Sequence, residues 1–130
     1  MFKRLLQSEA YRLAHEFNAT DFGLALPIVI TITASEKFAA QFFATWENDS
    51  VELDNEEWRE YHHIKIAFSE HWKDFNVLRC SVYHELVHCF QHEQGLECNH
   101  DASFWAWEKL AIIKGLTIRF PDDNFMVFIE

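Results

Sequence analysis

The chain has 130 residues, of which 49% are hydrophobic and 16% are aromatic. This length and composition predict one domain, residues 1–130, with a dense core, and they exclude two domains of ordinary size. The formal net charge is −10. That charge disfavours direct nucleic-acid binding, because neutralising phosphates requires clustered Lys and Arg.

The beginning of the chain and its cysteines bear on cellular location. Charged residues interrupt the first segment, so it does not have the apolar run of a signal peptide or a membrane span. Cys80, Cys89 and Cys98 fit no CxxC pattern and would leave one thiol over if two of them paired. Reduced thiols of this kind are typical of a cytoplasmic protein. The sequence indicates no oligomeric state.

Hydrophobic periodicity predicts the secondary structure in chain order. An amphipathic helix is expected over 2–17, and a strand rich in β-branched residues at 28–33. The other predicted elements are strands at 42–46 and 61–68, helices at 76–94 and 101–114, and a C-terminal hairpin of 116–120 with 125–129. Together they predict an α+β domain with a small, mostly antiparallel sheet packed against helices.

The helix predicted at 76–94 carries the sequence His84-Glu85-Leu86-Val87-His88, which fits the HExxH pattern of zinc peptidases. Residues i and i+4 of a helix lie about 5–6 Å apart at Cβ on one face, so His84 and His88 can bind one metal ion. Glu85 shares that face and can reach a metal-bound water as a general base. These residues form a polar stripe in an apolar helix, which indicates a buried site.

A catalytic zinc site usually has three protein ligands and a water, so a third ligand is expected. His100 is favoured, because the chain can reverse over 95–99 and return this residue to the helix. His92 continues the spacing of the motif, but it lies about 12 Å from His84 along the helix axis. The remaining candidates for the third ligand are Glu93, Asp101 and Glu108.

The order of these motifs resembles the SprT-like zinc metallopeptidases, the group that includes Spartan, whose pattern is HExxH followed by HGxxF. Here HELVH is followed by the segment His100-Asp101-Ala102-Ser103-Phe104. The next residue, Trp105, is also similar to the YgjP-like peptidases, which carry HSxxFW. The resemblance covers about residues 64–110.

This resemblance implies a zinc-dependent endopeptidase in which His84, His88 and His100 bind Zn²⁺ and Glu85 is catalytic. Asp101 stands where many relatives have Gly, which puts the shape of the substrate cleft in question. No CxxC pair follows, so the C-terminal zinc ribbon of many relatives is not expected.

Two functions of different classes follow from these observations. The first is hydrolysis of a protein or peptide substrate, in which zinc lowers the pKa of its water and Glu85 accepts the proton. Three residues are candidates to stabilise the oxyanion, namely Tyr61, Tyr83 and His92. The second is a catalytically silent metal-binding or inhibitory protein. It would work through the acidic residues between Glu47 and Glu60, which suit a basic partner or substrate. The presence of Glu85 in the motif favours the enzyme.

Overall fold

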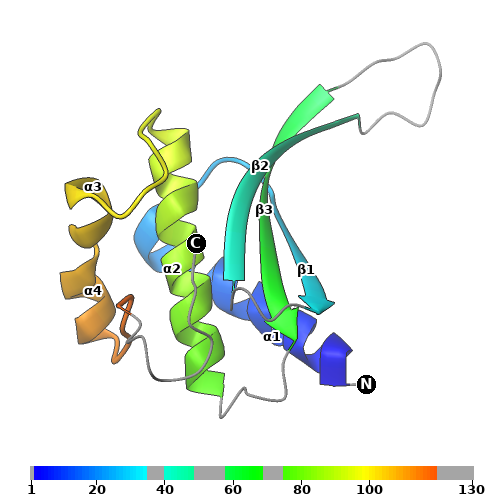
Figure 1. Cartoon of the computed structure of the whole chain (residues 1–130), viewed down its shortest axis with the longest axis horizontal. Helices are drawn as coiled ribbons and strands as arrows, with labels where there is room; N and C mark the ends of the chain where they lie inside the picture. Colours follow the sequence, from blue (N-terminus) through cyan, green and yellow to red (C-terminus); the bar gives the residue numbers. More distant parts are fainter. Residues whose placement is uncertain (1, 35–39, 49–57, 69–74, 120–130) are drawn as a thin grey trace.

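A computed structural model describes residues 2–34, 40–48, 58–68 and 75–119 (Figure 1). Its elements are α1 (Phe2–Phe17), the π-helical turn η1 (Asn18–Phe22), β1 (Ile28–Ala34), β2 (Ala40–Asn48), β3 (Trp58–Phe68), α2 (Phe75–Glu93), α3 (Ala102–Trp105) and α4 (Glu108–Ile113). The predicted α+β class is confirmed. Among the described residues, no helix has both the length and the apolar character that crossing a membrane requires.

The sheet has the strand order β1-β3-β2, with β3 in the centre. β2 and β3 are antiparallel, whereas β1 runs parallel to β3. The sheet is therefore mixed, where the sequence predicted a mostly antiparallel one. Local periodicity does not show that β1 adds to the far side of β3 in the same direction, because both arrangements give the same alternation of side chains.

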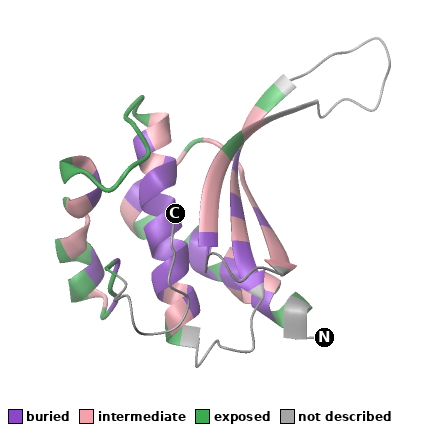
Figure 2. Cartoon of the chain, in the orientation of Figure 1, coloured by how far each residue is buried: buried purple, intermediate pink, exposed green. Residues whose placement is uncertain are grey.

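Two helices cover one face of this sheet, with α1 against β1 and α2 against β2 (Figure 1). Alternation along β3 directs His62, Ile64 and Ile66 into the interior, where all three are fully buried. Figure 2 shows that α2 is buried along most of its length. This burial follows from its position between the sheet on one side and α3 and α4 on the other.

The helix predicted over 101–114 is divided into α3 and α4 by a turn at Ala106 and Trp107. The break directs the Trp107 ring inward, with its centroid 4.5 Å from that of Phe22 and 5.0 Å from that of Phe90. Packing of this large, partly buried side chain against the core accounts for the break, since tertiary packing overrides helix propensity.

The predicted C-terminal hairpin falls largely outside the described residues, as does the segment 49–57 of the acidic stretch. Residues 116–119, which are described, do not form a strand. They run beside α2, and the Thr117 backbone N–H donates to Cys80 Sγ at 3.4 Å. This contact brings the backbone of Ile118 close to the HExxH segment of α2, where the Ile118 carbonyl oxygen lies 3.1 Å from His84 Nδ1.

Candidate metal centre

The chain reverses after α2 because the helix ends at Glu93 and is followed by Gly95, whose φ of +72° is the left-handed conformation typical of the residue after a helix C-terminus. The N–H groups of Gly95 and Leu96 close the last turn by donating to His92 O and Gln91 O at 3.1 and 2.8 Å. The returning segment then reaches Asp101, which caps α3 by accepting from the Ser103 backbone N–H at 2.9 Å. We call residues 96–101 the return loop; it carries His100.

Three imidazoles meet between α2 and the return loop. Each of His84, His88 and His100 offers one ligand atom, and these atoms all lie within 4.8 Å of one another. The Nε2 atoms of His84 and His100 are 3.1 Å apart, close to the roughly 3.4 Å expected between nitrogens of a tetrahedral zinc site. The structure thus brings the three predicted ligands together.

Hydrogen bonds orient both imidazoles of α2. His84 Nδ1 donates to the carbonyl oxygen of Ile118 at 3.1 Å, and His88 Nδ1 donates to Gln91 Oε1 at 2.7 Å. With the proton on Nδ1, each ring presents the lone pair of Nε2 to the site. The buried His88 Nε2 has no hydrogen-bond partner among the described residues. Such an arrangement is typical of metal-binding histidines and fits the donor set to zinc.

Phe104 forms the apolar wall of this site. It is fully buried, and its ring centroid lies 4.6 Å from that of His84, 5.0 Å from His88 and 4.7 Å from His100. A single side chain therefore packs against all three imidazoles, which restricts their rotation. The Phe of the predicted HxxxF segment has a structural role in the site.

The surroundings favour neutral imidazoles, the form that binds metals. Burial, together with the neighbouring His88 and His100, lowers the pKa of His84 well below its usual 6.5. Burial also lowers the pKa of His88 and that of His100. A neutral ring keeps a lone pair for a metal ion.

We expect the metal-free protein to lose stability as the pH falls below about 6.5, the usual histidine value. His84 and His88 are almost fully buried and have lowered pKa values in the fold, so the unfolded chain takes up protons that the native state does not. The free energy of unfolding that these two neutral histidines contribute is fully present above about pH 6.5. It decreases as the pH falls towards their pKa values in the folded protein, by up to about 1.4 kcal/mol per pH unit for each group. Denaturant unfolding with a chelator between pH 7.5 and 5.5 measures this slope, and a flat profile would contradict it.

Glu85 follows His84 on α2 and is fully buried. Burial raises the pKa of the Cys98 thiol, and the negative charge of Glu85 raises it further. Cys98 Sγ donates to the carbonyl oxygen of His88 at 3.4 Å, so this thiol of the return loop lies against the helix that carries Glu85.

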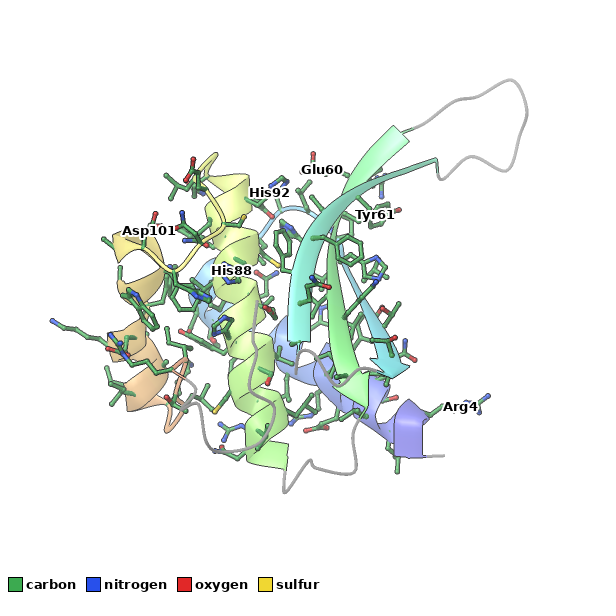
Figure 3. The ribbon with its side chains drawn as sticks, in the orientation of Figure 1. Arg4, Glu60, Tyr61, His88, His92 and Asp101 are labelled. Atoms are coloured by element: carbon green, nitrogen blue, oxygen red, sulfur yellow. The ribbon has the colours of Figure 1, made fainter. Side chains whose placement is uncertain are left out.

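The other candidate ligands have different partners. His92 Nε2 and Glu60 Oε1 form a hydrogen bond on the sheet side of α2, away from Asp101 (Figure 3). Glu93 accepts from His62 Nε2 at 2.6 Å and from the backbone of residues 25 and 26. Glu108 pairs with Arg119. Within the described residues, none of these groups belongs to the cluster of three histidines that could hold a metal ion.

The structure also separates two of the three candidates for oxyanion stabilisation from the site. Tyr83 is fully buried and donates its hydroxyl proton to Asp21 at 2.7 Å. Tyr61 alternates with the inward-facing His62 along β3, so it lies on the face of the sheet opposite α2 (Figure 3).

The hydrogen bonds of Gln91 and of the Ile118 carbonyl to two of the three histidines were not predicted from the motifs. The i+3 spacing from His88 to Gln91 was a signal for Gln91, because side chains at this spacing share a helix face. No sequence pattern indicates a backbone carbonyl that arrives from residue 118.

Comparisons of the chain with protein-family models, with curated proteins and with solved structures find no match. The SprT-like resemblance therefore rests on the motif residues themselves. The cluster of three histidines is the feature that carries a functional argument.

Proposed function

We propose that the protein is a zinc-dependent metallopeptidase of the SprT-like type that hydrolyses peptide bonds in a protein or peptide substrate. The convergence of His84, His88 and His100 carries this proposal. Three neutral imidazoles are a ligand set that zinc prefers, and three protein ligands leave a coordination position for water, as in catalytic zinc sites. The resemblance of the HELVH motif and the segment from His100 to Phe104 adds support.

We assign the following roles to the protein groups. A bound zinc ion lowers the pKa of water to about 7 and polarises a carbonyl group. The Glu85 carboxylate, next to His84 in the sequence and buried, takes a proton from the attacking water and returns it to the leaving amine. The carbonyl of Ile118 and the amide of Gln91 keep two ligands in the required tautomer.

Metal analysis tests the first part of this proposal. Protein purified without added zinc is expected to contain about one equivalent of zinc per chain, because three converging imidazoles bind zinc tightly at neutral pH. Cleavage of an unfolded protein such as casein should stop with a chelator and return when zinc is restored. Wild-type protein that takes up no metal yet cleaves this substrate would refute the assignment.

A further inference from the structure

The buried side chain of Gln91 connects the metal centre to the return loop. Gln91 is fully buried and lies three residues after His88, on the last turn of α2. Its Nε2 donates to the backbone oxygen of Asn99 at 2.9 Å and to Ser103 Oγ at 2.8 Å, while its Oε1 faces His88 Nδ1 at 2.7 Å. One amide group thus contacts the proposed ligand His88 and two residues that flank His100 in the sequence, Asn99 and Ser103.

The chemistry of these partners fixes the direction of each bond. A backbone carbonyl can only accept, so the group that faces Asn99 O must be the amide nitrogen of Gln91. The oxygen of the same amide then faces His88, and an amide oxygen also only accepts. His88 must therefore carry its proton on Nδ1, which leaves the Nε2 lone pair for the metal.

The same amide holds the loop that carries the third ligand. Asn99 immediately precedes His100, and Ser103 lies in α3, where its hydroxyl donates to Asp101 Oδ1 at 2.6 Å. The chain is thus tied to α2 on both sides of His100 by bonds that involve no metal. His100 itself is exposed, so these bonds supply restraint that burial does not.

We propose that Gln91 is a positioning residue that sets the tautomer of His88 and holds the return loop against α2, so that the three ligands are arranged before a metal ion binds. This inference rests on the proposed zinc site for its significance. Its two effects, on the proton of His88 and on the loop, belong to the metal-free protein and can be measured there.

Replacing Gln91 by Met tests both effects, because Met has a similar size but neither donates nor accepts as an amide does. Zinc affinity, measured by competition with a chelator, is expected to fall about 10- to 100-fold, as for other groups that orient metal ligands. In metal-free protein, ¹⁵N NMR of the imidazole should show His88 with its proton on Nδ1 in the wild type and a mixture of tautomers in Gln91→Met. The matched control is Gln94→Met, since Gln94 is exposed at the same end of α2.

Replacing Gln91 by Glu separates the two effects. A carboxylate still accepts from His88 Nδ1, so the tautomer should be retained, but it has no proton to donate to Asn99 O. The backbone amides of Ser103 and Phe104 should then exchange hydrogen faster in the metal-free protein, and zinc affinity should fall. Ser103→Ala removes one of the loop bonds and should show the same faster exchange at Phe104 to a smaller extent, without a change of tautomer.

The inference is overturned if Gln91→Met matches Gln94→Met in zinc affinity and in the His88 tautomer. If Gln91→Met does not fold, the exchange rates of Gln91→Glu and Ser103→Ala decide, and wild-type rates in both would overturn it. Should the wild type bind no zinc, the proposed peptidase fails, while the tautomer and exchange measurements still test the role of Gln91.

Discussion

His100→Ala is expected to weaken zinc binding by at least about 100-fold, whereas His92→Ala should leave it nearly unchanged. Structural zinc sites bind with a free energy on the order of 10 kcal/mol, so the loss of one of three ligands removes about 3 kcal/mol or more. His100 reaches within 3.1 Å of His84 Nε2. His92 lies two turns from His84 and is paired with Glu60. Chelator competition on the two purified variants measures the difference.

The comparison between these two histidines is well controlled, because neither is part of the buried core. His100 is exposed and His92 is partly exposed, so removing either ring creates no large cavity. Thermal unfolding of both variants without metal should confirm that the fold is kept. If His92→Ala proved the more damaging for zinc affinity, the third ligand would come from the helix and the role given to the return loop would be wrong.

The clustering of His84, His88 and His100 could be predicted from the sequence because its main determinants are local. The spacing of His84 and His88 sets their common helix face, and Gly95 marks where the helix must end. After the chain reverses at this point, the short segment that runs back along the helix contains one histidine, His100. The same local signals predicted α1 and the three strands.

The parts that the sequence did not reveal depend on tertiary contacts. The parallel pairing of β1 with β3 joins residues separated by more than thirty positions, and no periodicity distinguishes it from antiparallel pairing. The division of the helix predicted over 101–114 depends on the packing of Trp107 against Phe22 and Phe90. The hydrogen bond from His84 to Ile118 O also joins residues that are far apart in the sequence.

Glu85→Gln is expected to lower peptidase activity by at least about 100-fold while zinc content stays at the wild-type level, within the usual range for loss of a general base. Glutamine keeps the size of the side chain and its capacity for hydrogen bonds but cannot take up a proton from water. Because Glu85 is fully buried on α2, a variant of the same shape also keeps the packing of the helix. Zinc content and the rate of casein cleavage, measured on the same preparation, test this separation of binding from catalysis.

The same variant distinguishes the peptidase from a binding protein that uses its acidic stretch between Glu47 and Glu60. A binder needs the charges between Glu47 and Glu60 and has no use for a base at the metal site, so charge reversals in that stretch would abolish its effect. A peptidase depends on Glu85 because the proton must move as the water attacks, whatever the surface charge. If Glu85→Gln left the effect of the protein intact while the charge reversals removed it, the binder would replace the peptidase as the function of this fold.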